Sequence, residues 1–338
     1  MRGFPHNFVV DGIPVAASGS LGTVMSMPIA PFYPLSLLRQ SFRSDVVVHH
    51  SPFPLTDLAI AGLRARTALI VHWHADILGR DGLKAALMPF IRRSLARADR
   101  IIVSHPAMID ASESLQLVRE KCVAIPYGAD LEFWSELSFE NQAAAADLRR
   151  RFPRLILSIG RLVPYKGYPV LLHALKGMNA HLIIVGDGPL LASLKNLARE
   201  LGVADRVTFA GRLPRDRIKE LLHAARMLTL ASVSSAEAFG LVQIEAMAAG
   251  CPVVNTDLPT AVPFIARHEL EGLTVAQGDA DQLRAAMGRL LDDEGLAEAL
   301  GRAARVRARQ EFGINTFRER NFTVYREAIA YRNELSRK

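Results

Sequence analysis

Short runs of β-branched and aliphatic residues alternate with longer amphipathic stretches along most of the chain. This alternation is typical of βαβ units, whose strands form a parallel sheet with helices on its faces. We therefore predict an α/β protein with two doubly wound parallel sheets. The predicted strands are Asp45–His50, Thr67–Trp73, Arg100–Ser104, Cys122–Pro126, Leu155–Ile159, His181–Gly186, Arg206–Ala210, Met227–Ala231, Pro252–Thr256 and Leu273–Val275, and the predicted helices between the early strands are Leu55–Arg66, Leu83–Ala98 and Ala107–Arg119.

The segment from Tyr127 to Pro153 has no strand pattern and carries an Ala-rich, then Arg-rich, helical stretch. We interpret it as a linker between two domains. After Gln282 the pattern is helical, and the last amphipathic stretch runs from Ile314 to Arg337. The predicted organisation is one domain over residues 1–150, a second over 151–313 and a final helix over 314–338.

The composition suits a packed globular protein, because half of the 338 residues are hydrophobic and 22% are charged. Cys122 and Cys251 lie far apart in apolar stretches, so we expect no disulfide framework and a reducing cytoplasm. No apolar run reaches the roughly 18 residues of a membrane-spanning helix. The uncharged stretch 12–38 is interrupted by Gly and Pro, which predicts loop and short strand. No signal peptide is expected.

A first candidate site is the sequence SIGRLVPYKG, which follows the predicted strand Leu155–Ile159. It places Arg161 and Lys166 in one strand-to-helix loop. Two cations at the carboxyl end of a strand can neutralise a diphosphate, the arginine through a planar fork and the lysine as a point charge. The alternative is that both are solvated surface charges.

A second candidate is SAEAFGLVQIEAMAAG, in which Glu237 lies in a loop and Phe239, Gly240 and Leu241 open a helix that carries Glu245. The free N–H groups at a helix N-terminus suit a phosphate or a sugar hydroxyl. Glu237 could accept hydrogen bonds from sugar hydroxyls, and Glu245 from a ribose diol. Alternatively, Glu237 only favours the helix dipole and Glu245 lies on a polar helix face. The apolar residues around Glu245 weaken that alternative, because a carboxylate there needs a partner.

The sequence VHWHAD ends a predicted strand and places His72 and His74 on the same side, with Asp76 just beyond. A metal site is conceivable, but the spacing lacks the separated ligands of a structural zinc site. A hydrogen-bonded histidine in the core is the alternative.

The sequence GDGP departs from a dinucleotide fingerprint, because Leu191 occupies the third glycine position and Pro189 interrupts it. We predict a tight turn with Pro189 as the first helical residue, and a nicotinamide dehydrogenase is disfavoured.

Together, GRLVPYKG, GDGP, VTFAGRL and EAFGLVQIE followed by AMAAGCPVV resemble the retaining family 4 glycosyltransferases. Their order and spacing match from about Asp45 to the C-terminus. The resemblance implies the GT-B fold: two Rossmann-like domains that face each other across a cleft, with the C-terminal helix crossing back to pack on the first domain.

The resemblance also implies a role for each matching residue. Arg161 and Lys166 would bind the donor diphosphate and stabilise the departing nucleoside diphosphate, Glu237 would hold the donor sugar and Glu245 the ribose. His74 matches the family's histidine near the reacting carbon. These transferases need no metal or added cofactor, which fits two cations acting in place of Mg²⁺. The remaining implied donor contacts are Phe239, Gly240 and Leu241 at the sugar and phosphates, and Gly211, Arg212 and Leu213 beside the base.

The expected activity is that of a metal-independent retaining hexosyltransferase of the EC 2.4 class. The donor would be a nucleotide-diphosphate sugar, with GDP-mannose favoured. The acceptor would be a saccharide or a lipid-linked acceptor in polysaccharide or glycolipid assembly.

A basic amphipathic stretch offers an explanation for part of the net charge of +7, so no nucleic-acid partner is expected. It predicts peripheral contact with the inner face of the membrane, and the alternative is a helix packed on the sheet. Pro89 is expected to start or kink this helix. Its apolar positions are Leu83, Leu87, Ile91 and Leu95, and its cations are Lys84, Arg92, Arg93, Arg97 and Arg100.

The chain departs from the family at its start, because Met1–Asp11 leads directly into the segment that follows the first strand, Gly-Gly loop and helix of other members. We expect a truncated acceptor-side domain with an exposed sheet edge. The alternative function is a catalytically impaired nucleotide-binding remnant. A GT-B sugar-nucleotide epimerase is disfavoured by the two glutamates of EAFGLVQIE.

Overall fold

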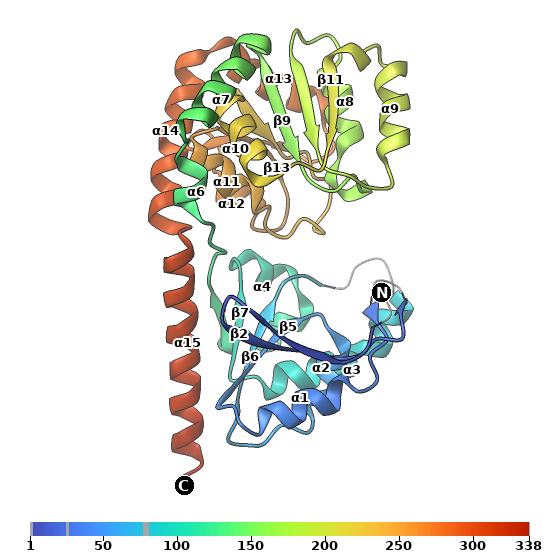
Figure 1. Ribbon diagram of the computed structural model, residues 1–338, viewed down its shortest axis with the longest axis vertical. Helices are drawn as coiled ribbons and strands as arrows, with labels where there is room; N and C mark the ends of the chain where they lie inside the picture. The colour runs from blue at the N-terminus through green and yellow to red at the C-terminus, as the bar shows by residue number, and fades with distance from the viewer. Residues whose placement is uncertain (1–2, 25–26, 77–80, 338) are drawn as a thin grey trace. The chain divides into compact units, whose positions relative to one another are not determined.

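The computed structural model describes residues 3–24, 27–76 and 81–337. The chain forms two compact units (Figure 1). The first unit comprises Met1–Ile125 and Glu319–Lys338, and the second Pro126–Arg318. Each contains a parallel sheet with helical connections, which confirms the predicted α/β class.

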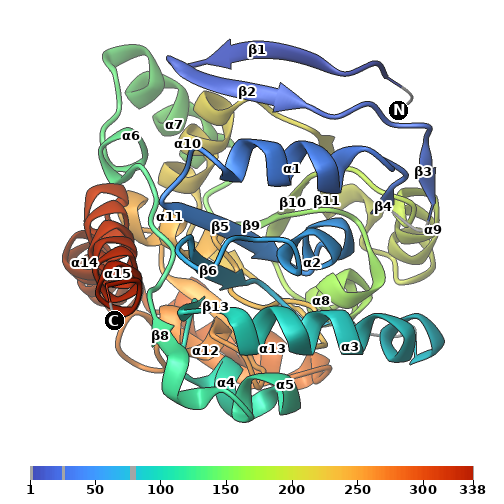
Figure 2. The same cartoon turned by 90° about the horizontal axis from the view of Figure 1, so that it is seen from below.

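The sheet of the first unit is four-stranded, in the order β5, β6, β7, β8. All pairs are parallel, and β5 lies at one end of the described order. Helix α1 (Tyr33–Ser41) packs against α2, and α2 packs against α3 (Figure 2). The strands are β5 (Val46–Ser51), β6 (Ala68–Trp73), β7 (Arg100–Val103) and β8 (Cys122–Ala124), and the connecting helices are α2 (Pro54–Ile60), α3 (Asp81–Arg97), α4 (Ala107–Ala111) and α5 (Glu113–Gln116).

Ahead of this sheet in the chain lie two short antiparallel pairs and one helix. Three of the four short strands lie in the stretch predicted as loop and short strand, whereas the helix and the first strand were not predicted. The pairs are β1 (His6–Val10) with β2 (Ile13–Ala17), and β3 (Thr23–Val24) with β4 (Met27–Pro28). Helix α1 (Tyr33–Ser41) begins within the stretch predicted as loop and short strand, and Pro34 lies in its first turn. Proline is tolerated there, because the N–H it lacks would have no partner inside the helix.

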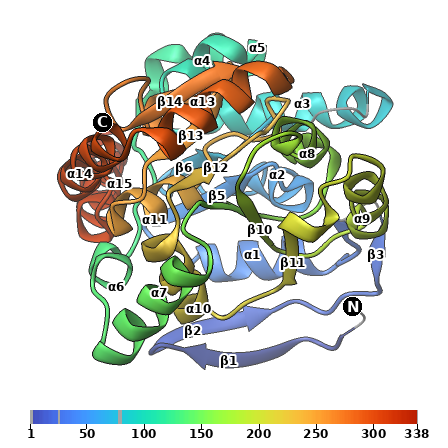
Figure 3. The same ribbon diagram turned by 90° about the horizontal axis from the view of Figure 1, so that it is seen from above.

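The sheet of the second unit is six-stranded and parallel, in the order β11, β10, β9, β12, β13, β14. Numbered from the first strand of this unit, the order is 3-2-1-4-5-6, so it reverses between β9 and β12. Helices cover both faces (Figure 3), as predicted for a doubly wound sheet. The strands are β9 (Leu155–Ile159), β10 (His181–Val185), β11 (Val207–Gly211), β12 (Met227–Thr229), β13 (Val253–Asp257) and β14 (Gly272–Ala276).

Two hydrophobic cores lie on opposite faces of this sheet. One is built with α8 (Tyr168–Leu175), α9 (Leu191–Glu200) and α13 (Ala280–Asp292). The other is built with α7 (Phe139–Arg151), α10 (Arg215–Ala224), α11 (Val242–Ala249) and α14 (Glu294–Glu311).

The segment interpreted as a linker belongs to the second unit. It contains α6 (Leu131–Ser135) and α7, and α7 packs against α10. Trp134, Ala145 and Leu148 are buried in the core on that face. The helical character was predicted, but the burial was not, because the pattern of alanines and arginines gives α7 only a narrow apolar face.

Helix α15 (Ile314–Leu335) ends the chain, and its residues from Glu319 onward belong to the first unit. Arg332 Nε donates to Asp99 Oδ1 at 2.7 Å, and Tyr325 Oη lies 2.8 Å from His72 Nε2. Within the described chain, no helix is both long and apolar enough to cross a membrane.

The C-terminal half of the apolar stripe in the basic stretch is packed inside the first unit. Ile91 and Leu95 of α3 are buried, whereas Arg92 and Arg93 are exposed. Arg97 donates to two backbone carbonyls and contacts Asp99. Pro89 lies inside α3. The structure thus has the packed helix given as the alternative; the side chains of Leu83 and Lys84 lie outside the described part.

Candidate functional site

The loops that follow β9 and β12 meet where the strand order of the second unit reverses. Ligands of open α/β sheets bind at such a point, outside the carboxyl ends of the strands. Arg161 and Lys166 follow β9, and Glu237 follows β12, so the fold brings the two candidate motifs together. Val233 N donates to Tyr165 O at 2.8 Å, which joins the two loops directly.

At the centre of this site lies a buried ion pair. Lys166 Nζ lies 2.5 Å from Glu237 Oε2, and the two side chains are only 12% and 9% exposed. Ser232 Oγ donates to the same Oε2 at 2.9 Å. Oε2 is therefore held by two donors, and Oε1 is the oxygen of Glu237 that can accept from a ligand. The Arg161 side chain is exposed.

Gly167 lets the cationic loop lie against the neighbouring strand. Its φ is +67°, and a Cβ placed there would lie 1.8 Å from the carbonyl oxygen of Ala231. This residue also caps the N-terminus of α8. Only glycine fits both the left-handed backbone and the close approach.

The GDGP turn joins the cationic loop to the loop after β11. Gly186 N donates at 2.7 Å to the oxygen of Gly211, the last residue of β11, and Leu162 N donates to Asp187 O at 3.0 Å. Asp187 Oδ1 accepts from the N–H of the next residue. The predicted tight turn is confirmed. Pro189 precedes the helix instead of starting it, since α9 begins at Leu191 after a turn.

Glu245 lies in the first turn of α11, with Phe239, Gly240 and Leu241 just before the helix. Phe239 is buried and Leu241 is exposed. Burial raises the pKa of the Glu245 carboxyl to about 7, and Arg215 opposes part of this rise. Arg215 of α10 thus lies close enough to favour the ionised carboxylate, but burial has the larger effect on its pKa.

Arg215, Ser232 and Tyr168 were not identified from the sequence. The Arg215 guanidinium lies 4.2 Å from the ring centre of Phe133. The buried Tyr168 hydroxyl donates to Gly160 O at 3.0 Å and fixes the start of the cationic loop. All three residues lie next to the motifs in the sequence, but their contacts with the site form only when the chain folds, so no residue pattern marks them. Leu213 is half-buried and packs against the core of this unit.

The predicted His74 lies in the first unit, at the carboxyl end of β6. Its ring centre is 6.3 Å from that of His72, which confirms that the two histidines point to the same side. His72 is buried, and burial with its histidine neighbours lowers its pKa to about 4. Asp76 Oδ1 accepts from Ser112 Oγ at 2.9 Å. Over residues 3–24, 27–76 and 81–337, no group of His, Cys, Asp and Glu side chains is arranged to hold a metal ion.

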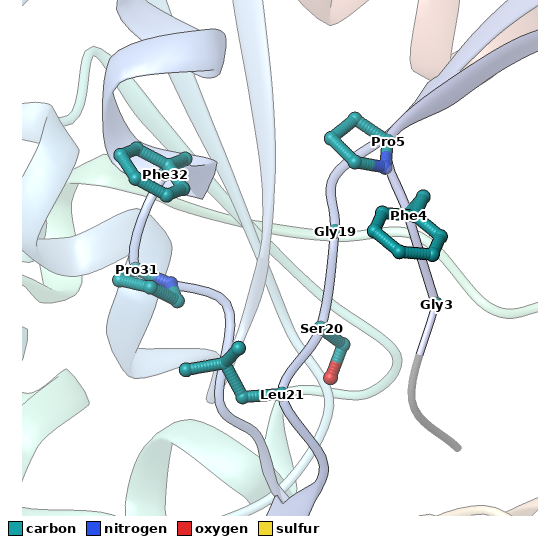
Figure 4. A pocket seen from close by; sticks show the side chains of 8 residues that line it. All are labelled: Gly3, Phe4, Pro5, Gly19, Ser20, Leu21, Pro31 and Phe32. Atoms are coloured by element: carbon teal, nitrogen blue, oxygen red, sulfur yellow. The ribbon is translucent and has the colours of Figure 1, made fainter.

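A separate apolar cavity of about 620 Å³ lies in the first unit and contains none of the predicted site residues. Figure 4 shows Phe4 and Pro5 on one side, Pro31 and Phe32 on the other, and Leu21 between them.

Two family models match the chain. "Glycosyl transferase 4-like domain" covers residues 2–128, and "Glycosyl transferases group 1" covers residues 143–307. D-rhamnosyltransferase WbpZ of Pseudomonas aeruginosa is 31% identical over 83% of this chain and 74% of its own length. The chain belongs to the group 1 glycosyltransferases. Another relative of this glycosyltransferase, O-antigen chain mannosyltransferase C of Escherichia coli, is 27% identical over 79% of this chain and 71% of its own.

Solved structures show the same fold. Anabaena Alr3699/HepE in complex with UDP superposes with a TM-score of 0.76 at 22% identity, over 88% of this chain and 82% of that one. Sucrose-phosphate synthase from Thermosynechococcus elongatus gives a TM-score of 0.74 at 24% identity, over 89% and 78%. The glycosyltransferase therefore has the predicted GT-B fold.

Proposed function

We propose that this glycosyltransferase moves a hexosyl unit from a nucleotide-diphosphate sugar to a saccharide or lipid-linked acceptor, with retention at the anomeric carbon and without a metal ion. The observation that carries the proposal is the Lys166–Glu237 pair at the reversal of strand order. It supplies a cation for the diphosphate and a fixed carboxylate for the sugar hydroxyls next to each other.

In this proposal, the residues of the second unit hold the donor. Arg161 and Lys166 neutralise the diphosphate, so the charge that develops on the departing nucleoside diphosphate is stabilised without Mg²⁺. Oε1 of Glu237 accepts from the sugar hydroxyls, and Glu245 accepts from the ribose diol. His74, contributed by the first unit, acts near the reacting carbon.

Mannose is the favoured sugar. Relatives named as mannosyltransferases support it, including a Mycobacterium tuberculosis GDP-mannose-dependent enzyme that is 37% identical over 48% of this chain. Anabaena HepE was solved with UDP-glucose, so UDP-glucose is the competing donor to test.

For the lipid-linked acceptor, we propose that the exposed Arg92 and Arg93 attract an anionic membrane surface at its cytoplasmic face. Because Ile91 and Leu95 are buried, this contact would be electrostatic and would weaken with salt.

The purified full chain should transfer sugar from GDP-mannose faster than from UDP-glucose, in the presence of a chelator, and the product anomer should match the donor by NMR. Glu237→Gln should abolish transfer. A chain that binds GDP by calorimetry but neither transfers nor hydrolyses any donor would instead be the nucleotide-binding remnant. Inversion of the anomer, or full activity of Glu237→Gln, would contradict the proposal.

A further inference from the structure

Three histidines, His50, His72 and His74, form a cluster at the carboxyl ends of β5 and β6 in the first unit. His50 and His72 are register partners on the two parallel strands, with ring centres 4.9 Å apart. His74 follows β6, and its ring lies within 5° of parallel to that of His50. The motif VHWHAD contains His72 and His74, whereas His50 comes from the neighbouring strand β5.

Within this cluster, His50 and His74 are directly bonded through ring nitrogens. Nδ1 of His50 lies 2.8 Å from Nε2 of His74. His72 bonds elsewhere, with its Nε2 2.8 Å from Tyr325 Oη. Burial and the neighbouring histidines lower the pKa values of all three rings, which keeps the cluster neutral near pH 7.

A hydrogen bond between two neutral imidazoles couples the tautomers of the two rings, because only one of the facing nitrogens can donate. One of the two facing nitrogens must carry the hydrogen and the other must be bare. The state of His74 Nε2 is thus tied to that of His50 Nδ1. Since a neutral imidazole carries one N–H, fixing Nε2 also fixes the state of Nδ1 on the same ring.

We propose that His50 is a positioning residue that holds His74 in one ring tautomer and one orientation. Its importance for transfer rests on the role proposed above for His74. A ring held in a single tautomer presents a defined donor or acceptor to the substrate, whereas an unheld ring presents the wrong one for part of the time.

The test is ¹⁵N NMR of histidine ring nitrogens in the full chain, because their chemical shifts report the tautomer directly. Signals of His74 are assigned by their loss in His74→Gln. The test variants are His50→Leu, which removes the bond, and His50→Asn, whose amide group can replace Nδ1. His50 is exposed, so neither variant empties the core. His173→Leu, at an exposed histidine of α8, is the matched control.

We expect one dominant tautomer of His74 in the wild-type chain. His50→Leu should change the tautomer ratio by about 2- to 12-fold, the weight of one ordinary hydrogen bond, and His50→Asn should restore it. In transfer assays, His50→Leu should lower kcat while KM for the donor stays unchanged, with recovery in His50→Asn. The control should change neither readout.

An equal mixture of tautomers in the wild-type chain, or an unchanged ratio in His50→Leu, would overturn the proposal. If the wild-type chain transfers no sugar, the proposed function fails, but the NMR ratio still decides whether His50 holds His74.

Discussion

Individual residues decide the chemistry of the candidate site, and the pairing of Lys166 with Glu237 is the clearest case. Each side chain was predicted to contact the donor separately, and the structure places them against each other. Lys166 thus has two possible partners, the carboxylate and an incoming diphosphate. In the proposed function, a bound donor would share or take over a cation that already contacts Glu237.

Breaking this pair should therefore cost stability as well as activity. Lys166→Met or Glu237→Gln should each lower the free energy of unfolding by about 3–5 kcal/mol, because one buried charge loses its partner. The double variant should lose less than the sum of the two, as measured by urea unfolding. Glu298→Gln removes an exposed pair with Arg302 and should change stability by under about 1 kcal/mol. Strict additivity of the two losses would show that the pair is not coupled.

Glu245 should make donor binding depend on pH. In the proposed function the ribose hydroxyls donate to the ionised carboxylate, whose pKa of about 7 means that it becomes protonated as pH falls below neutrality. GDP affinity measured by calorimetry should fall up to about tenfold between pH 8 and pH 6. Glu245→Gln should remove this part of the pH dependence, while the part due to the phosphates remains. Identical pH profiles for both chains would refute the role of Glu245.

The raised pKa of Glu245 affects folding stability in the opposite direction from donor binding. Burial favours the neutral carboxyl, so the folded-state pKa of Glu245 is raised above its unfolded value. The stability that the neutral Glu245 carboxyl gives to the folded chain is present at low pH and is lost as pH rises through about 7. Donor binding near neutral pH thus uses a charge that the empty site disfavours.

At the scale of elements, the loops after β9, β10, β11 and β12 form one connected set. Backbone hydrogen bonds link each loop to a neighbour, and close approaches at glycines make the contacts possible. The four motifs therefore hold one another in place. A substitution that moves one loop should therefore also displace the loop bonded to it.

Gly167→Ala tests this tight packing. The new Cβ would collide with Ala231 O in a left-handed backbone, so we expect a loss of about 2–5 kcal/mol and weaker GDP binding. Gly177 has a similar φ of +80° but open space around its Cβ. Gly177→Ala should cost only about 1–2 kcal/mol and leave GDP binding unchanged. Equal losses in the two variants would show that backbone strain, not the contact, limits Gly167.

At the scale of the whole molecule, α15 ties the end of the chain to the sheet of the first unit. Asp99 is buried. Its carboxylate accepts hydrogen bonds from Arg332 Nε and from the backbone N–H of Leu69, and it forms an ion pair with Arg97. Residues more than two hundred positions apart thus share one carboxylate. The last helix is part of the first unit's fold as well as a continuation of the second.

Removing this contact should loosen the first unit. Arg332→Ala should lower stability by about 1.5–3 kcal/mol, the weight of a hydrogen bond to a charged group. Hydrogen exchange should then rise in β6 and β7. Arg326→Ala, on an exposed face of the same helix, should change neither. Unaltered exchange in Arg332→Ala would mean that Asp99 is satisfied by its other donors.

The sequence by itself determined the alternation of strands and helices, because runs such as Leu155–Ile159 are apolar except for Ser158 and need burial on both faces. It also determined the family, since its motifs keep fixed order and spacing. It did not reveal α1, which begins within a proline-containing stretch, or the burial of Ala145 and Leu148 in α7, whose apolar face is narrow.

Tertiary structure alone decided which side chains meet. The Lys166–Glu237 pair, its donor Ser232 and the His50–His74 bond all join residues from different strands or loops. Periodicity reports burial within one element, but it carries no information about strand order. Strand order sets which carboxyl ends are neighbours, and it therefore decides which predicted residues share a site.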